Sequence, residues 1–466
     1  MLEQQFLAGM TLENIAKACK GTYVGDGSRR YEMITGAVMD SRIVEEGNLF
    51  FAIKGERVDG HDFIPSVFEK GAIAVISEHA LAKPAGPYIL VDSTLQAMKD
   101  LAVWYRENLT CKIVGVTGSV GKTSTKEMIA SVLKQKYKVL KTTGNYNNQI
   151  GLPLTMFRIR PEHEVAVLEL GISDFYEMHR LATMANPHIC VITNIGLCHL
   201  EKLGDRDGVL RAKTECFEHM TPGGTVILNG DDDKLSTKTV VNDKPAIFYG
   251  LEAKSNGKEN AIYATDIKNL GFEGMEAVIH TPQGDFDAKI NIPGEHNESN
   301  ALAATSVGLE LGLSLDEIQK GIASAETIAG RTNFIRKNDR IIIDDCYNAN
   351  PVSMEASLEV LSHATGRSVA VLGDMGELGA NEVELHKTVG RYVGEKKIHT
   401  LFCAGELAAN YASAAKEANP DCEVYYFETR EEMVEPLRNY LQPKDSVLIK
   451  ASHFMGFTEL VEDLTK

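Results

Sequence analysis

Residues 112–125 bring together the residue types that bind nucleotide phosphates. The segment reads as a buried strand, a glycine-rich loop and a helix that opens at Lys122. Such a loop points successive backbone N–H groups at one concavity, where the helix N-terminus adds partial positive charge. Lys122 can reach the outer phosphates, and the Thr123 hydroxyl can ligate Mg²⁺. The usual pattern has a glycine where this chain has Val116, but the Gly-Lys-Thr run still favours an ATP site over an ordinary strand–turn–helix.

Two more side chains stand at the ends of strands that we expect in the same sheet, and a third lies on a nearby helix. Glu169 ends one strand, where it is either a solvated carboxylate or a Mg²⁺ ligand shared with Thr123. His199 follows the next strand, and Lys213 lies on a helix that can lead back to the same cleft. An unmodified buried lysine beside a metal is electrostatically unfavourable, whereas a lysine carbamylated by CO₂ is an anionic ligand. The arrangement predicts a metal site, but the spacing does not reveal the modification.

The polar segment 143–153 places Asn145, Asn147 and Asn148 close together after a predicted strand near 138–142. Asparagine and glycine are common in turns, so an ordinary turn is one interpretation. The other is that these amides face the nucleotide and support hydrated Mg²⁺. The residues alone leave both open.

The elements that must position these residues form three strand–helix series. Alternation of strand and helix predicts mostly parallel sheets with helices on both faces, and ligands at the carboxyl ends of the strands. Residues 261–293 instead suggest an antiparallel ribbon built onto the central sheet. We therefore expect an α/β protein with domains at 1–108, 109–329 and 330–466. The expected strands are 48–53, 72–76 and 88–91 before a helix at 94–108; 112–116, 164–169, 189–193 and 225–229; and 340–345, 368–373, 399–403, 423–427 and 446–450.

Composition restricts the class of protein. The chain has 466 residues, and ~150 residues per domain suggests about three domains. A net charge of −17 argues against general binding to nucleic acid or an anionic membrane. Eight cysteines without a Cys-x-x-Cys pair indicate reduced thiols in a cytoplasmic protein. The first residues lack the features of a signal peptide, no apolar run approaches the ~20 residues of a membrane helix, and the glycines at 373, 376 and 379 do not support a dinucleotide cofactor.

Taken together, these motifs resemble the ATP-dependent Mur ligases of bacterial cell-wall synthesis, over essentially the whole chain. The shifted glycine at 115 is also what that family shows. Residues 294–301 and the Gly330-Arg331 pair look like its adenine-binding and hinge-region motifs. Residues 40–42, 47–51 and 59–63 are similar to its UDP-sugar-binding domain. The resemblance implies an N-terminal UDP-binding α/β domain, a central P-loop-type ATPase domain and a C-terminal Rossmann-like domain.

The resemblance also implies roles for particular residues. Lys122, His199 and Lys213 are expected to be catalytic, and Thr123, Glu169, His199 and carbamylated Lys213 to hold Mg²⁺. The substrate-binding residues of the first domain are expected to be Ser41, Arg42, Gly60 and His61. The expected nucleotide-binding residues are Thr117, Gly118, Ser119, Val120, Gly121, Lys122, Thr123, Ser124, Asn145, Asn148, Asn297, Asn300, Arg331, Asp345 and Asn348.

Residues 344–351 and 372–379 resemble the family member that uses ATP to join D-alanyl-D-alanine to UDP-N-acetylmuramoyl-tripeptide (UDP-MurNAc-tripeptide). The resemblance thus implies ATP and Mg²⁺ as cofactors, small-molecule substrates, no nucleic acid or membrane partner, and a monomer. One alternative is the member that adds the third amino acid to UDP-MurNAc-dipeptide, although the Asp-Asn-Pro-Arg motif of its diaminopimelate-using version is not in this chain. Another is a nucleotide-dependent binding protein that does not catalyse ligation.

One segment departs from the family pattern. The family usually has Lys-Gly-Ser-Arg near the C-terminus, whereas this chain has Lys450 followed by Ala-Ser-His453. An arginine can pair with an anion through two parallel hydrogen bonds, and histidine cannot reproduce that geometry. We therefore transfer no role to His453.

Overall fold

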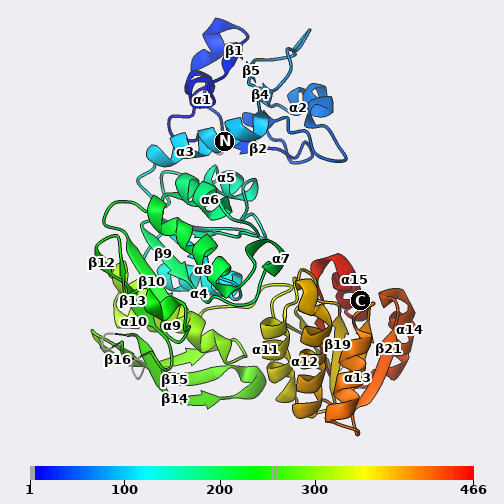
Figure 1. Cartoon of the computed structure of the whole chain (residues 1–466). Coiled ribbons are helices and arrows are strands. Elements are labelled where there is room, and N and C mark those ends of the chain that lie inside the picture. Colours follow the sequence, from blue (N-terminus) through cyan, green and yellow to red (C-terminus); the bar gives the residue numbers. More distant parts are fainter. Residues whose placement is uncertain (1–5, 254–256, 259–260) are drawn as a thin grey trace.

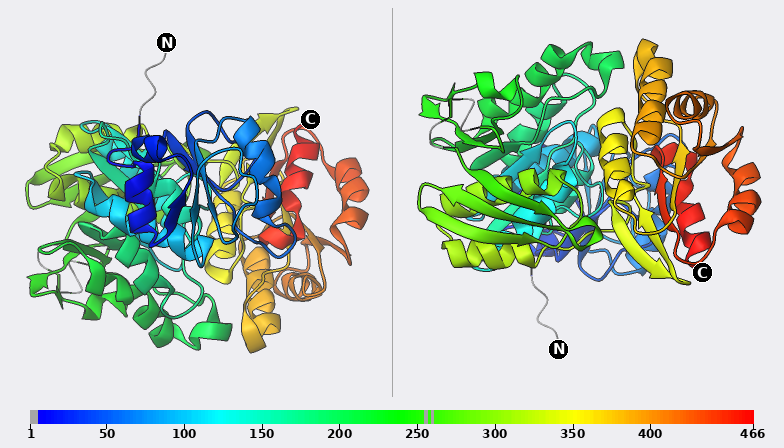
Figure 2. Two further views of the ribbon diagram at one scale, coloured as in Figure 1. Left: turned by 90° about the horizontal axis from the view of Figure 1, so that it is seen from above. Right: turned by 90° about the horizontal axis from the view of Figure 1, so that it is seen from below.

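The computed structural model describes residues 6–253, 257–258 and 261–466, which form three α/β domains (Figure 1). Seen from above, the first domain lies over the middle of the molecule, with the central and last domains on opposite sides (Figure 2). The first five residues, on which the expectation about a signal peptide partly rests, lie outside the described part. Within the described ranges, no helix has the length and apolar character needed to cross a membrane.

The first domain is built on a five-stranded sheet in the order β1-β5-β4-β3-β2. Only β1 runs antiparallel to its neighbour, because the remaining pairs are parallel. Helix α3 (Thr94–Glu107) is capped at its N-terminus by Ser93, whose side chain accepts a hydrogen bond from the backbone N–H of Gln96. The helix carries the chain to the central domain. The edge strands β1 and β2 were not predicted. The strands are β1 (Thr22–Val24), β2 (Gly36–Val38), β3 (Asn48–Phe51), β4 (Ala74–Ser77) and β5 (Tyr88–Leu90), and the other helices are α1 (Leu12–Ala18) and α2 (Ile64–Glu69).

The central domain contains a six-stranded parallel sheet in the order β13-β10-β9-β6-β8-β7. Its middle strands are almost wholly buried, because helices α4 and α9 cover one face and α5, α6 and α8 the other. The predicted parallel sheet is confirmed. The strands are β6 (Lys112–Thr117), β7 (Val139–Lys141), β8 (Val165–Glu169), β9 (Ile189–Ile192), β10 (Thr225–Asn229) and β13 (Ile247–Tyr249), and the helices are α4 (Lys122–Leu133), α5 (Gly151–Met156), α6 (Glu177–Ala185), α7 (Leu200–Leu203), α8 (Arg206–Thr214), α9 (His296–Glu310) and α10 (Leu315–Ala323).

The predicted antiparallel ribbon is a separate three-stranded sheet of β14 (Tyr263–Asn269), β15 (Met275–Thr281) and β16 (Gly284–Ile290). It touches the central sheet through a single bridge between Tyr249 and Ile262. Its apolar face packs into the same core as α9, so packing rather than strand pairing joins it to the domain. The predicted antiparallel ribbon is thus present, built onto the core that also covers one face of the central sheet.

The last domain contains a six-stranded sheet in the order β17-β18-β22-β19-β20-β21. All its pairs are parallel except β17 with β18, and β17 was not predicted. The strands are β17 (Asn333–Lys337), β18 (Arg340–Asp344), β19 (Ser368–Gly373), β20 (Thr400–Ala404), β21 (Glu423–Phe427) and β22 (Ser446–Lys450), and the helices are α11 (Pro351–Ser362), α12 (Glu382–Glu395), α13 (Ala409–Ala418), α14 (Arg430–Tyr440) and α15 (Phe457–Leu464).

The first and central domains share one hydrophobic core, which runs from Leu7 to Ala261. At their boundary the ring of Phe157 lies 6.0 Å from that of Phe51 and 6.2 Å from that of Tyr105. The buried residues that form the two cores of the last domain all lie between Ile342 and Leu464. The last domain thus has cores of its own, and Phe272 of the central domain packs against one of them.

Candidate functional site

The glycine loop lies between β6 and α4 and closes against the segment after β9. At Gly118 the backbone has φ +149°, and a Cβ would lie 1.9 Å from the Thr193 hydroxyl oxygen, so only glycine fits. The side chain of Asn194 accepts a hydrogen bond from the backbone N–H of Val120 at 2.9 Å. Helix α4 begins without a side-chain cap, which leaves its first backbone N–H groups available to an anion.

Lys122 is folded back over this loop. Its ammonium group donates to the carbonyl oxygen of Gly118 at 2.8 Å and lies 3.3 Å from that of Ser119. Burial lowers the pKa of Lys122, while the negative charge of Glu169 acts in the opposite direction. The loop therefore carries one desolvated cation at the start of the helix.

Glu169 ends β8 beside Val116, as the parallel register requires. Its side chain is buried, and Oε1 accepts a hydrogen bond from Asn147 Nδ2 at 2.8 Å. Oε2 is buried and has no hydrogen-bond partner among the residues that the structure describes, although the Lys126 ammonium nitrogen lies 3.8 Å away. A buried carboxylate oxygen that lacks a donor fits a Mg²⁺ ligand, because a hard cation would satisfy it.

Lys213 lies at the end of α8 and is only 1% exposed. Burial, followed by the positive charge of Lys122, lowers the pKa of Lys213 to about 8. An amine with this pKa is partly neutral near pH 8, the form that reacts with CO₂. The arrangement thus fits a lysine that can be carbamylated.

His199 is the N-cap residue of α7, with φ +51°. Its Nδ1 atom lies 2.9 Å from Oε2 of Glu377, which belongs to the last domain. Burial lowers the pKa of His199, Glu377 raises it, and the positive charges of Lys213 and Lys122 lower it further. These electrostatic interactions place the predicted metal and phosphate residues in one neighbourhood.

A cavity of about 270 Å³ separates this loop from the last domain. Several predicted nucleotide residues line it, together with Lys450 and His296, which lie in segments used for the resemblance but were not singled out as site residues. Asn297 is buried and does not line it, because its amide group donates to the carbonyl oxygen of Pro293 and accepts from Asn300. The predicted residues in the lining are Val120, Gly121, Ser124, Asn300, Arg331 and Asp345.

Arg331 bridges the two sides of the cavity. Its guanidinium carbon lies 3.8 Å from the ring centre of Tyr347, and its Nη2 donates to the Thr123 hydroxyl at 3.4 Å. Its Nε is buried and finds no hydrogen-bond partner within the described part of the chain. Nε thus leaves the guanidinium group capacity for an anion between the domains.

Asp345 has a different environment, although it also lines the cavity. Its oxygens accept hydrogen bonds from the backbone of Thr332, the hydroxyl of Ser357 and the ammonium group of Lys450, the last at 2.6 Å. Asn348 accepts from Lys450 through its carbonyl oxygen. These bonds hold the strand ends together, and contact of Asp345 and Asn348 with nucleotide stays a prediction.

The three asparagines of the segment after β7 make different contacts. Asn147 holds Glu169, whereas the Asn148 side chain accepts from the backbone N–H groups of Ile150 and Gly151 at the start of α5. Asn145 hydrogen-bonds Tyr347. The choice of Asn145 and Asn148 over Asn147 therefore missed the amide that contacts the candidate metal ligand.

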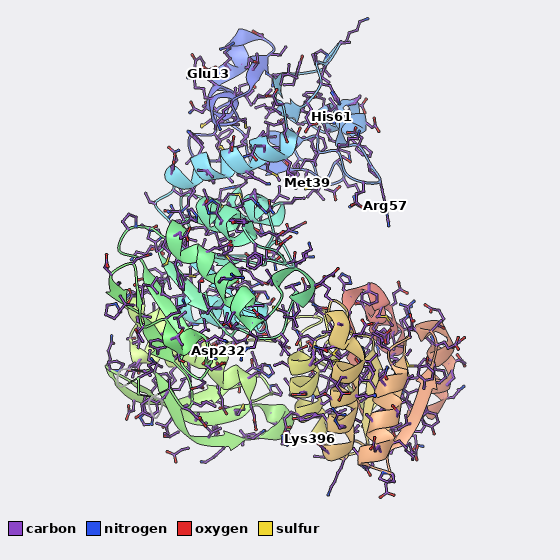
Figure 3. The ribbon with its side chains drawn as sticks, in the orientation of Figure 1. Glu13, Met39, Arg57, His61, Asp232 and Lys396 are labelled. Carbon is purple, nitrogen blue, oxygen red and sulfur yellow. The ribbon has the colours of Figure 1, made fainter. Side chains whose placement is uncertain are left out.

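The predicted substrate residues of the first domain do not join this cavity. The Arg42 guanidinium pairs with Asp40 and lowers the pKa of that carboxyl to about 2. The Nδ1 atom of His61 lies 2.7 Å from Asp59. At Gly60 a Cβ would lie 2.7 Å from the backbone of Ile53, and the carbonyl oxygen of Ser41 accepts a hydrogen bond from Lys70. His61 lies on the side of the domain turned toward the last domain (Figure 3).

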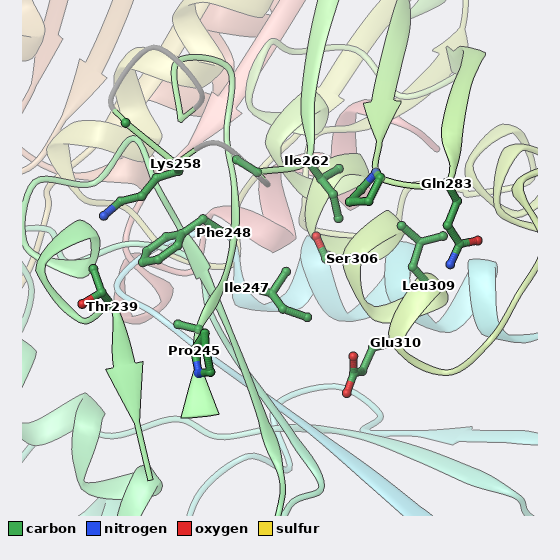
Figure 4. Close-up of a pocket in the computed structure, with 14 residues that line it drawn as sticks. Thr239, Pro245, Ile247, Phe248, Lys258, Ile262, Gln283, Ser306, Leu309 and Glu310 are labelled. Carbon is green, nitrogen blue, oxygen red and sulfur yellow. The ribbon is translucent and has the colours of Figure 1, made fainter. Parts of the chain in front are cut away.

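A hollow of about 570 Å³ elsewhere in the central domain contains none of the predicted site residues. It lies against β13 and the end of α9, with Phe248, Ile262 and Leu309 in its wall (Figure 4). Volume alone therefore does not mark the site, whereas the convergence of loop, carboxylate and lysines does.

Comparison with known families decides the class of this site. The family model described as Mur ligase middle domain matches residues 116–308, and Mur ligase, glutamate ligase domain matches residues 330–453. A third, Mur ligase family, catalytic domain, matches residues 33–106. The chain belongs to the Mur ligase family. Both halves of the cavity described above thus come from Mur ligase domains.

Individual Mur ligases are similar over nearly the whole length. UDP-N-acetylmuramoyl-tripeptide–D-alanyl-D-alanine ligase of Bacillus subtilis is 36% identical over 97% of this chain and 98% of its own. The Escherichia coli protein of that name is 33% identical over 91% and 92%. The crystal structure of MurF from Acinetobacter baumannii superposes with a TM-score of 0.86 at 34% identity, covering 98% of both chains. That of MurF ligase from Thermotoga maritima in complex with ADP has a TM-score of 0.78 at 30% identity, covering 92% of this chain and 96% of that one.

Proposed function

We propose that this Mur ligase joins D-alanyl-D-alanine to UDP-N-acetylmuramoyl-tripeptide, with conversion of ATP to ADP and phosphate. The similarity to ligases of that name over the full chain supports the choice of substrates. The observation that carries the chemistry is the convergence of Lys122, Glu169 and Arg331 at the glycine loop, where the charges of Glu169 and Arg331 both act on the pKa of Lys122 and Arg331 reaches Thr123. We further propose domain bounds at 1–108, 109–329 and 330–466, a monomeric state and a cytoplasmic location.

The proposed reaction has two steps. In the first, a carboxylate oxygen of the tripeptide attacks the γ-phosphorus of ATP, the bond to ADP breaks, and an acyl phosphate forms. In the second, the amine of D-alanyl-D-alanine attacks the acyl carbon, phosphate leaves, and the nitrogen loses a proton. Lys122 and the α4 N-terminus offset the repulsion between two anions in the first step. Arg331, which belongs to the last domain, offsets the same negative charge from the opposite side of the cavity.

Thr123, Glu169, His199 and carbamylated Lys213 are the residues that would hold Mg²⁺. When bound there, Mg²⁺ neutralises negative charge on the phosphates. The buried Oε2 of Glu169 supports this set, as does the depressed pKa of Lys213, which makes its neutral amine available to CO₂. Asn147 orients Glu169 through its hydrogen bond to Oε1.

The test is a ligation assay with ATP, Mg²⁺ and UDP-MurNAc-tripeptide, with and without D-alanyl-D-alanine. We expect phosphate release coupled to a product heavier than the tripeptide substrate by one dipeptide less one water. Tripeptides with lysine or diaminopimelate at the third position, run in parallel, identify the natural form. Lys122→Ala is expected to abolish the reaction, and Lys134→Ala, after the end of the same helix, serves as the control.

Absence of product with both tripeptides would refute the assignment. Product from UDP-MurNAc-dipeptide and a free amino acid would favour the ligase that adds the third residue. Slow phosphate release that no substrate stimulates would favour a nucleotide-dependent binding protein.

A further inference from the structure

Two residues with unusual backbone conformations meet across the boundary between the central and last domains. His199 has φ +51° and Glu377 has φ +60°, a region that L side chains rarely adopt. Their side chains approach to 2.9 Å, Nδ1 of His199 to Oε2 of Glu377. Such conformations persist only where the surrounding structure holds them, and they concentrate at functional sites.

The loop that carries Glu377 is fixed from two sides. The backbone N–H of Gly376 donates to the Ser452 hydroxyl at 2.8 Å, and that of Met375 donates to His386 Nε2 at 3.0 Å. The loop follows β19, so the last domain presents Glu377 as one rigid unit. The Glu377 side chain is nevertheless 66% exposed, so burial within its own domain does not explain its position.

A carboxylate at Nδ1 of His199 decides which ring nitrogen can bind a metal. A neutral histidine that carries its proton on Nδ1 has its lone pair on Nε2. Histidines that bind metals almost always donate the other ring N–H to a carboxylate or carbonyl, which fixes the tautomer and the ring orientation. In this chain the carboxylate comes from a different domain than the candidate metal ligands Glu169 and Lys213.

We propose that Glu377 is a positioning residue that completes the metal site from the last domain. It accepts the Nδ1 proton of His199 only when the two domains are docked, and it thereby leaves Nε2 free for the metal. Metal affinity and domain docking are then linked, and each strengthens the other by the same factor. The inference rests on the proposed function insofar as His199 is a ligand of that metal site.

The test measures Mn²⁺ binding to the full-length protein by the electron paramagnetic resonance signal of free Mn²⁺, with a β,γ-imido analogue of ATP present. Glu377→Ala is expected to weaken binding about tenfold or more, in the range seen for outer-shell partners. Glu377→Gln should weaken it less, because its amide oxygen still accepts the Nδ1 proton. Glycine tolerates a positive φ, so Glu377→Gly should have the same Mn²⁺ affinity as Glu377→Ala if the effect comes from the lost side chain and not from the backbone.

Glu417→Gln is the matched control, because it removes one exposed carboxylate from α13 of the same domain and should not alter binding. Small-angle X-ray scattering supplies the reciprocal measurement: Mn²⁺ with the analogue should compact the wild type more than Glu377→Ala. Wild-type affinity in Glu377→Ala, or tighter binding there, would overturn the proposal. His199→Ala distinguishes a failure of the positioning role of Glu377 from a failure of the proposed function. Unchanged Mn²⁺ binding in His199→Ala contradicts the metal assignment of the proposed function itself.

Discussion

The central domain meets its two neighbours in contrasting ways. Against the first domain it shares a continuous hydrophobic core, in which Phe157 stacks on Phe51 and is 1% exposed. Against the last domain the contacts are mostly polar, and include the approach of His199 to Glu377 and an exposed ion pair of Arg336 with Glu273. Burial of apolar area is strong and non-directional, whereas exposed polar contacts add little free energy.

This difference assigns different tasks to the two interfaces. The first interface binds two domains into one folding unit, because separating them would expose core side chains to water. The second is held by contacts that cost little free energy to break, and residues of both domains line the candidate nucleotide cavity beside it. An acyl phosphate reacts with water, so a last domain that closes over the site before chemistry suits the proposed reaction.

The largest expected effect comes from the apolar interface. Phe157→Ala should lower the free energy of unfolding by about 3–5 kcal/mol, because it removes a buried ring and leaves a cavity. Urea denaturation measures the change. Phe454→Ala removes the same ring at a position that is 73% exposed and should change stability by less than about 0.5 kcal/mol. Equal losses in the two variants would show that Phe157 does not join the domains.

The second effect belongs to the polar interface and is expected in activity. Arg331→Ala should reduce kcat/KM for ATP about a hundredfold, or about 2.7 kcal/mol, while the unfolding midpoint moves little. Arg336→Ala removes an arginine from the same interface at an exposed ion pair and should leave kcat/KM within about twofold. If Arg331→Ala loses stability instead of activity, the distinction between the two interfaces fails.

A pH dependence is expected at the apolar interface, where Arg106 of α3 approaches His188. Burial, followed by the charges of Arg106 and Lys112, lowers the pKa of His188 to about 4, and His188 Nδ1 accepts the backbone N–H of Ile113 at 3.0 Å. The unfolded chain therefore takes up this proton first, so stability falls as pH drops from about 6.5 toward 4 and then levels off.

Because water screens the half-buried ring of His188, we expect this residue to lower the free energy of unfolding by about 1 kcal/mol between pH 7.5 and pH 5. Urea midpoints of wild type and His188→Gln at the two pH values isolate it, since the glutamine oxygen can still accept from Ile113. An identical pH dependence in both proteins would exclude His188 as the source.

The smallest effect is expected where the second interface carries an aromatic pair. Phe334 and Phe272 face each other edge-on with ring centres 5.1 Å apart. Phe334→Leu keeps an apolar side chain and should cost about 1 kcal/mol or less in the unfolding of the last domain. A loss as large as that of Phe157→Ala would mean that the two interfaces do not differ in kind.

The sequence predicted the elements whose signal is local. Strands buried on both faces are short apolar runs, so β6, β8, β9 and β10 were found close to their true bounds. The edge strand β17 has half-exposed residues and gives no such run, and its antiparallel pairing with β18 depends on the folded sheet. The antiparallel ribbon of β14–β16 was recognised from the sequence, but the residue pattern does not say that it joins the domain by packing against α9 and α10.

The site divides in the same way. Lys122 and Thr123 stand next to each other in a recognisable loop, and their places at the start of α4 were predicted. Asn194, Lys450 and Glu377 come from distant segments, so only the folded chain shows that they hold the loop, Asp345 and His199 respectively. Glu377 lay inside a motif used for the resemblance, and that motif was the only available signal.

The shared core has a consequence for how the chain is made. A core that draws on residues from Leu7 to Ala261 cannot be completed until the ribosome has released more than half of the protein. Until the segments that cover it have been synthesised, the apolar face that the first domain contributes to this core stays exposed to water. The last domain, with its cores between Ile342 and Leu464, can close as soon as its own segment emerges.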